Sequence, residues 1–430
     1  MAIGETATLL LALLVITVVA RVLGAICKRF GQPEVIGEIA GGILLGPSLF
    51  HGEIARTVFP AEIRPELRTI SSVGVCVFMF LVGLHLAESR LRGQGRIVLS
   101  LSIGSMVVPF VLGGLFAIGV VGDRSGRNAV LFCLFVGTAM SITAFPVLAR
   151  ILTDRQLIDT PIGGLALAVA AVGDFFAWAM LSVLVALSHG DQPPWRILLV
   201  VPFVAFLVGV VRPVLAGLAE RRSGRPRGSV ARIAGGAGTV AAIAGALWLS
   251  SAATEWMGLH QIFGAFLLGA AMPRSGAADL RERVLPRVEQ VNRILLLPAF
   301  FVVAGFAVNL SGMDAREFGL LLLILLVAVG GKVVGAFLAA RLVRVSPRHS
   351  VALGLLVNTR GLTELIVLAI GLQIGLLDQR LYSLLVLMAL VTTSMAGLLL
   401  PFVYPRRQAE PHREGGPAPE FAPLVKEESR

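Results

Sequence analysis

The sequence predicts an all-α polytopic membrane protein of about 13 transmembrane helices, in which two crossed, discontinuous helices belong to an inverted repeat. Composition is the first observation behind this prediction. Of the residues, 56% are hydrophobic and only 15% are charged, whereas soluble domains are about one quarter charged. Apolar runs of roughly 17–28 residues are the second observation, because each can cross about 30 Å of hydrocarbon as a helix. A transmembrane barrel would show short alternating segments instead, so a helical bundle is predicted.

These apolar runs define one transmembrane domain at residues 8–404. We expect their boundaries to be correct to within several residues. The predicted spans, in chain order, are residues 8–26, 34–50, 70–87, 97–121, 128–152, 162–187, 196–219, 230–251, 257–272, 291–310, 318–340, 350–376 and 381–404.

The basic residues between these spans provide the third observation. Loops on one side of the membrane, together with the C-terminal stretch, hold 25 Lys and Arg residues, and loops on the other side hold 8. Because basic loops remain in the cytoplasm, the N-terminus is predicted outside and the C-terminus inside, in a cell (plasma) membrane. The same asymmetry explains the net charge of +11 without a nucleic-acid partner.

The remaining general features exclude several classes of protein. Residues 405–430 are rich in Pro, Gly and charge and are predicted to form a disordered cytoplasmic tail. The first apolar run is long for a cleaved leader, so we expect it to be a spanning helix. No clustered metal ligands and no phosphate-binding glycine loop occur in the sequence. We therefore predict neither an enzyme nor a cofactor, and no metal beyond a transported cation.

The sixth span carries a carboxylate near its middle. Asp174 lies in a predominantly apolar stretch from Pro161 to Leu187. A charged side chain at the centre of a bilayer costs several kcal/mol, from about 2.5 upward, and such residues mark ion or proton pathways. Asp174 is therefore the predicted proton- and ion-binding residue.

Polar residues interrupt the fifth and twelfth spans. The first interruption runs from Thr138 to Pro146 and includes Ser141 and Thr143; the second, at residues 357–364, includes Asn358, Thr359, Arg360, Gly361 and Glu364. Proline and glycine both weaken a helix, and backbone groups freed within a membrane need protein or water partners. Such interruptions in oppositely directed spans are typical of transporter sites. For either stretch alone, a simple kink with hydroxyl groups bonded to their own helix is the alternative.

Four further charged residues have open roles. Lys332, in the eleventh span, either pairs with Asp174 as a coupled unit or donates to carbonyl groups at a helix break. Arg360 and Glu364 are spaced to pair on one helix face or to compensate the dipoles at the break. Glu38 lies among glycines that favour close helix packing, and it either supports that packing or lines a cytoplasmic funnel.

These motifs together resemble the monovalent cation:proton antiporter-2 family, and most of all its Kef-type bacterial and plant cation/proton exchangers. The resemblance extends over about residues 10–404. The motifs that support it lie at residues 32–48, 141–152, 174–178, 259–269, 296–301 and 358–365.

The resemblance implies an ion-transport core, about residues 70–187 and 291–404, beside a scaffold that forms a homodimer. It implies that Asp174 alternately binds a proton or a Na⁺ or K⁺ ion. Ser141 and Thr143 would lie at the ion, whereas the helix breaks and their dipoles would depend on Thr138, Asn358, Thr359, Lys332, Arg360 and Glu364.

Two departures from the family pattern modify these expectations. Many relatives carry Asp or Asn directly before the key Asp, whereas this sequence has Gly173. A single carboxylate favours electroneutral exchange. The nucleotide-binding regulatory domain of Kef systems has no counterpart in the sequence, so nucleotide-gated potassium efflux is not expected.

The predicted function is secondary active exchange of protons for Na⁺ or K⁺ by an elevator-type alternating-access mechanism. One alternative is a proton- or cation-coupled carrier of an organic ion on the same fold, which requires a larger polar cavity. Another alternative is a passive cation channel, which would conduct without proton coupling.

Overall fold

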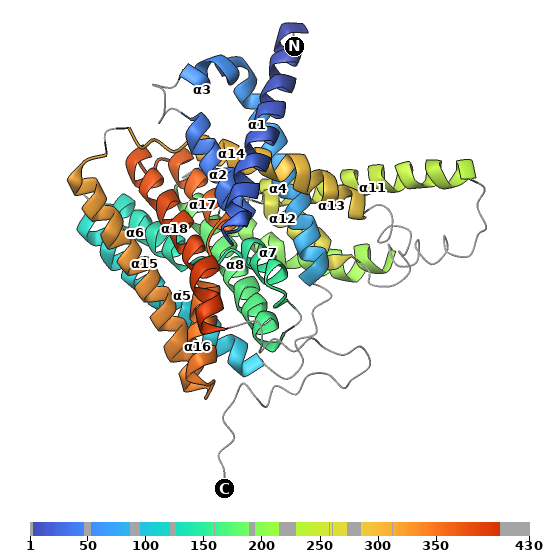
Figure 1. Ribbon diagram of the computed structural model, residues 1–430. Helices are drawn as coiled ribbons and strands as arrows, with labels where there is room; N and C mark the ends of the chain where they lie inside the picture. The colour runs from blue at the N-terminus through green and yellow to red at the C-terminus, as the bar shows by residue number, and fades with distance from the viewer. Residues whose placement is uncertain are drawn as a thin grey trace. The chain divides into compact units, whose positions relative to one another are not determined.

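The computed structural model of this protein describes residues 3–46, 53–86, 95–120, 126–158, 160–188, 194–214, 229–257, 259, 261–272, 285–311 and 313–404. The predicted tail at residues 405–430 lies outside these ranges. Every regular element within them is a helix (Figure 1). In chain order the helices are α1 (Ile3–Arg29), α2 (Glu34–Leu45), α3 (Glu53–Val58), η2 (Ala61–Ile63), α4 (Arg64–Leu86), α5 (Gly95–Val120), α6 (Gly126–Ser141), α7 (Phe145–Asp154), α8 (Pro161–Ser188), η3 (Pro194–Leu199), α9 (Val200–Phe206), η4 (Leu207–Val211), α11 (Ser229–Trp256), α12 (Gln261–Ala271), α13 (Leu285–Val291), η6 (Asn292–Leu296), α14 (Leu297–Phe306), α15 (Ala315–Leu342), α16 (Pro347–Val357), α17 (Leu362–Gln373) and α18 (Gln379–Val403).

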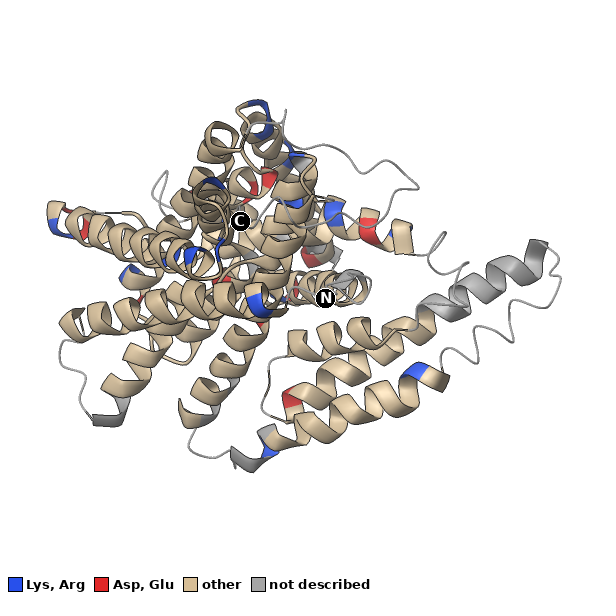
Figure 2. Cartoon of the chain, turned by 90° about the horizontal axis from the view of Figure 1, so that it is seen from below, with Lys and Arg blue, Asp and Glu red and all other residues tan. Residues whose placement is uncertain are grey.

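Each predicted span overlaps one of these helices or a succession of them. Within the described ranges, seven helical stretches are long and apolar enough to cross a membrane; they belong to α1, α4, α5, α8, α13 to α14, α15 and α18. Long stretches of helix carry no charged residue (Figure 2). The predicted all-α, multi-pass membrane fold is thus confirmed. The fifth and twelfth spans are each divided in two, into α6 and α7 and into α16 and α17.

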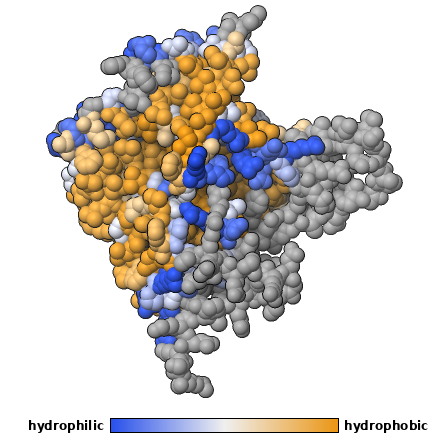
Figure 3. Space-filling model, viewed as in Figure 1, coloured by the Kyte–Doolittle hydropathy of each residue, from blue (hydrophilic) through white to orange (hydrophobic). Residues whose placement is uncertain are grey.

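Helices α5 and α15 show how apolar residues are divided between lipid and protein. Figure 3 shows a hydrophobic face in this region, and the exposed apolar residues of the two helices are three, four or eight positions apart, on one side of each helix. On the opposite face the two backbones touch, because a Cβ atom built on Gly335 would lie 2.3 Å from the carbonyl oxygen of Gly104. Small residues permit such close approach of membrane helices. The exposed residues are Leu99, Ile103, Val107, Val111, Leu115 and Ile118 on α5 and Phe318, Leu322, Leu326, Val334, Leu338 and Leu342 on α15.

The helices form two compact units. One comprises residues 1–17, 58–90 and 185–303, and in it α12 packs against α4 and α11. The other comprises residues 18–57, 91–184 and 304–430 and contains both divided helices. Within this second unit α5 contacts α6 and α15, and α18 contacts α15, α16 and α17 (Figure 1). All residues discussed below as a candidate site belong to the second unit.

Candidate ion-binding site

The first helix break separates α6 from α7. Helix α6 ends at Ser141 and α7 begins at Phe145, with Pro146 in the first turn of α7, where a missing N–H removes no helical hydrogen bond. The hydroxyl group of Thr143 donates to the carbonyl oxygen of Val357 at 2.8 Å. The N–H of Ala144 donates to the carbonyl oxygen of Thr359 at 3.0 Å. The two breaks, more than two hundred residues apart in sequence, therefore meet.

The second break separates α16 from α17 and requires a glycine. Gly361 has a φ of +154°, and a Cβ atom on it would lie 2.6 Å from Cγ2 of Val147 in α7. Both the backbone conformation and the close approach of α7 thus exclude a side chain. Thr393 of α18 stabilises this break, because its Oγ1 atom accepts a hydrogen bond from the N–H of Arg360 at 3.1 Å.

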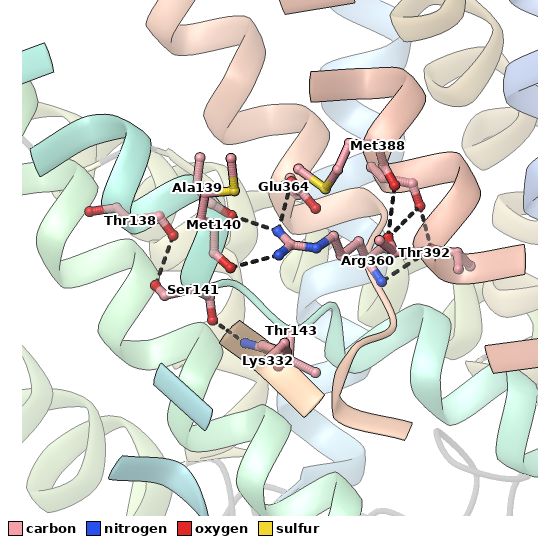
Figure 4. A network of polar contacts seen from close by, with 12 residues as sticks. Thr138, Ala139, Met140, Ser141, Thr143, Lys332, Arg360, Glu364, Met388 and Thr392 are labelled. Atoms are coloured by element: carbon pink, nitrogen blue, oxygen red, sulfur yellow. Dashed lines mark hydrogen bonds and ion pairs between the residues drawn. The ribbon is translucent and has the colours of Figure 1, made fainter. Parts of the chain in front are cut away.

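Two buried cations satisfy the carbonyl groups at the end of α6 (Figure 4). Arg360 donates from Nη1 to the carbonyl oxygen of Ala139 at 2.9 Å and from Nη2 to that of Met140 at 2.6 Å. Lys332 donates from Nζ to the carbonyl oxygen of Ser141. The last carbonyl groups of a helix lack intrahelical donors and carry a partial negative charge. Arg360 and Lys332 therefore compensate a helix end that would otherwise be unsatisfied inside the membrane.

The sequence left two roles open for Lys332, and the structure shows a contact with a backbone carbonyl group, that of Ser141. Lys332 and Asp174 both lie in the described ranges, and no hydrogen bond or close ion pair joins them, although their charges interact at longer range. Arg360 and Glu364, by contrast, form an ion pair of 3.0 Å between Nη1 and Oε1, with both side chains fully buried.

Asp174 lies on α8 with 7% of its surface exposed. The Thr363 hydroxyl group and the N–H of Phe145 are close to its carboxyl group. Phe145 begins α7 and Thr363 is in the first turn of α17, so the N-terminal ends of two half-helices approach Asp174. Helix N-termini favour negative charge. In the part of the chain that the structure describes, Oδ1 of Asp174 has no hydrogen-bond partner of good geometry.

Several other polar side-chain atoms at the helix breaks also lack a hydrogen-bond partner among the described residues. Buried side-chain atoms without a partner among the described residues include both polar atoms of Asn358 and the hydroxyl oxygens of Thr359 and Thr363. Buried polar groups are nearly always hydrogen-bonded, so such a group of exceptions calls for an explanation. Asp174 and these three residues therefore have unused hydrogen-bonding capacity.

The other predicted hydroxyl groups are bonded to backbone. Thr138 lies inside α6, three residues before its end, and donates to the carbonyl oxygen of Leu134 at 2.7 Å. Ser141 donates to the carbonyl oxygen of Thr138 at 2.8 Å. Since each hydroxyl proton is committed to a carbonyl group, the oxygen lone pairs of Ser141 and Thr143 remain available as ligands.

Two residues at the breaks were not among the predicted site residues: Thr363, which lies inside the predicted interruption at residues 357–364, and Thr393. Thr363 follows Gly361 by two positions, so its place in the first turn after a break was a usable signal. Thr393 lies in the polar triplet at residues 392–394 of an otherwise apolar span, which was a weaker signal.

Comparison with known proteins gives consistent matches over nearly the whole chain. Residues 12–404 match the family described as "Sodium/hydrogen exchanger, transmembrane". The Na(+)/H(+) antiporter NhaS4 of Synechocystis is 36% identical over 416 residues, which cover 93% of this chain and 99% of that protein. Cation/H(+) antiporter 17 of Arabidopsis thaliana is 37% identical over 407 residues, which cover 92% of this chain and 48% of that protein. This chain therefore spans about half the length of the plant relative.

A solved structure supports the fold independently. The sodium proton antiporter MjNhaP1 of Methanocaldococcus jannaschii superimposes with a TM-score of 0.62 at 15% sequence identity. The match covers 92% of this chain and 96% of that one.

Proposed function

Because this chain belongs to the sodium/hydrogen exchanger family of transmembrane proteins, we propose that it exchanges protons for Na⁺ or K⁺ across a membrane. The observation that carries the proposal is the surroundings of Asp174. Its carboxyl group is buried, has an oxygen without a partner, and lies close to the N-terminal ends of α7 and α17. Such a carboxylate can hold a proton or a cation.

The mechanism follows from competition for this carboxylate. When Asp174 is deprotonated, its oxygens bind the cation with help from Thr363, Ser141 and Thr143. When Asp174 is protonated, the cation leaves, because one carboxylate cannot hold both. The site must be open to one side of the membrane at a time for the two gradients to be coupled.

Lys332 and Arg360 have a fixed role in this mechanism. Lys332 donates to the carbonyl group of Ser141, and Arg360 donates to those of Ala139 and Met140. In the proposed mechanism both side chains stay with the end of α6 throughout the cycle. Asp174 is then the group that changes its charge. One proton exchanged for one monovalent cation gives electroneutral transport.

The remaining elements of the proposal concern assembly and location. The protein acts as a homodimer in a cell membrane, with its N-terminus outside and its C-terminus in the cytoplasm. A transport core, about residues 70–187 and 291–404, moves as an elevator against a scaffold formed by the other spans. The alternation of basic loops supports this orientation.

Proteoliposomes loaded with a pH-sensitive dye test the proposal. An acid-inside gradient is imposed, Na⁺ or K⁺ is added outside in turn, and loss of internal acid is recorded. The wild type should respond to at least one cation, whereas Asp174→Asn should insert and fold normally but show no exchange. Asp314→Asn is the matched control, because it makes the same chemical change at the exposed N-cap of α15, where Asn is also a good cap.

Normal exchange by Asp174→Asn would contradict the proposal. A wild type that responds to neither cation would favour the organic-ion carrier. Cation flux without proton movement would favour the passive channel.

A further inference from the structure

Glu38 is a buried carboxylate that the mechanism above does not use. It lies on α2 with 5% of its surface exposed. Its Oε1 atom is 3.9 Å from Nη1 of Arg150, which is too long for a hydrogen bond. Its Oε2 atom is buried and has no hydrogen-bond partner within the described ranges. Glu38 is therefore only loosely paired.

The nearby charges do not fully neutralise Glu38. Arg150 of α7 contacts Glu34 much more closely, and Glu34 also binds Lys28, with 3.0 Å between Oε1 and Nζ. The charged groups that act on Glu38 are Arg150 from α7, Glu34 from α2 and Arg21 from α1. A second carboxylate thus competes with Glu38 for the same guanidinium group. Since an uncompensated buried charge is costly, Glu38 needs a proton or a further cation.

Helix α2 is held in place by backbone contacts on both sides of Glu38. A Cβ atom on Gly37 would lie 2.3 Å from the carbonyl oxygen of Leu23 in α1. One on Gly305 of α14 would lie 2.3 Å from the carbonyl oxygen of Ile39. Glycines therefore bring three backbones together at this level of α2, and the helix cannot shift to expose Glu38 without losing these contacts.

Helix α7 connects Glu38 to Asp174. Its first residue, Phe145, is next to Asp174, and Arg150 is next to Glu38. Five residues of α-helix separate Phe145 from Arg150, a rise of about 7.5 Å. One residue beyond Arg150, α7 lines a cavity of about 240 Å³, whose other lining residues include Lys28, Gln32 and Arg155. Along α7, Arg150, which contacts Glu38, thus lies between Phe145, close to Asp174, and the residue that lines this cavity.

We propose that Glu38 is a second site for a proton or monovalent cation, a relay between Asp174 and the aqueous side at the C-terminal end of α7. The inference rests on the proposed exchange function. Glu38 holds either one proton or one cation, so a proton that arrives from Asp174 replaces a cation, and a cation that arrives from water replaces a proton. Only O–H bonds form and break. Arg150 is a positioning residue, because it holds Glu34 and leaves Glu38 available.

The test compares Glu38→Gln with Glu34→Gln in oriented proteoliposomes, with cation supplied from either side. Glu38→Gln should raise KM for the cation about tenfold on one side only, which corresponds to about 1.4 kcal/mol. Its maximal rate should stay close to that of the wild type. Glu34→Gln removes the same charge from the same helix and lets Arg150 pair more closely with Glu38, but it leaves the Glu38 carboxylate in place, so its KM should rise less than that of Glu38→Gln. Glu38→Asp keeps the charge and should give an intermediate KM.

Three outcomes would overturn the relay. The first is an unchanged KM for Glu38→Gln on both sides, and the second is an equal change for Glu34→Gln. The third outcome applies if Glu38→Gln does not fold, and it is a KM for Glu38→Asp equal to that of the wild type. A wild type without exchange would overturn the exchange function and the relay together, whereas normal wild-type exchange with any of the three outcomes overturns the relay alone.

Discussion

Replacement of Arg360 by methionine should be the most damaging single change at the helix breaks. The substitution keeps a long apolar side chain but removes the guanidinium group, which contacts Glu364 and the carbonyl groups of Ala139 and Met140. Breaking a buried ion pair by removing one partner costs about 3–5 kcal/mol. Each buried carbonyl group left without a donor costs a further 1–3 kcal/mol or so. Even if these terms overlap, the expected loss of stability is about 5 kcal/mol.

A double-mutant cycle separates these contributions. In Glu364→Gln the guanidinium group keeps its carbonyl partners, so the loss should be about 1–3 kcal/mol. The double variant Arg360→Met/Glu364→Gln leaves no unpaired charge, so it should be more stable than Arg360→Met alone. Thermal unfolding of the purified proteins in detergent, followed by size-exclusion chromatography of the heated samples, ranks the variants. A double variant no more stable than Arg360→Met would refute the argument that an unpaired Glu364 contributes to the loss.

Two further predictions concern packing and charge transport. Gly269→Ala should destabilise the protein by about 1–3 kcal/mol, because the new Cβ atom would lie 2.0 Å from the carbonyl oxygen of Phe80. Gly330→Ala is its control, because a Cβ atom there meets no described atom within 4 Å, and its unfolding temperature should not fall. One-for-one exchange moves no net charge, so its rate should be insensitive to membrane potential. If net charge did move, each elementary charge would change the driving force by about 2.3 kcal/mol per 100 mV. A rate that follows an imposed potential would exclude one-for-one exchange.

Much of the fold could be predicted because the signals are local in sequence. Every apolar run predicted to span the membrane overlaps a helix, and the resemblance to cation/proton antiporters is confirmed at the level of the sodium/hydrogen exchanger family. The breaks were also predictable, since Pro146 and Gly361 act on their own backbone whatever surrounds them. The number of spans and the crossing of the divided helices stay predictions.

The partners of the buried polar groups were harder to predict. Asp174 was recognisable because a carboxylate in an apolar span is unusual wherever the helix packs. The sequence left Lys332 with two roles, and the contact with Ser141 appears only because α15 passes the end of α6. Thr363 belongs to the candidate site only because the first turn of α17 comes close to Asp174.

The sequence by itself therefore determined that the chain is a helical membrane protein with two interrupted spans and a buried carboxylate. Each of these properties depends on the free energy of a residue in lipid or on the conformation of its own backbone. Only the tertiary structure decided which helix ends meet, and hence that Arg360 satisfies carbonyl groups 220 and 221 residues away. The physical reason is that a buried donor must find an acceptor, but the local sequence around the donor does not specify which of several helix ends will supply that acceptor.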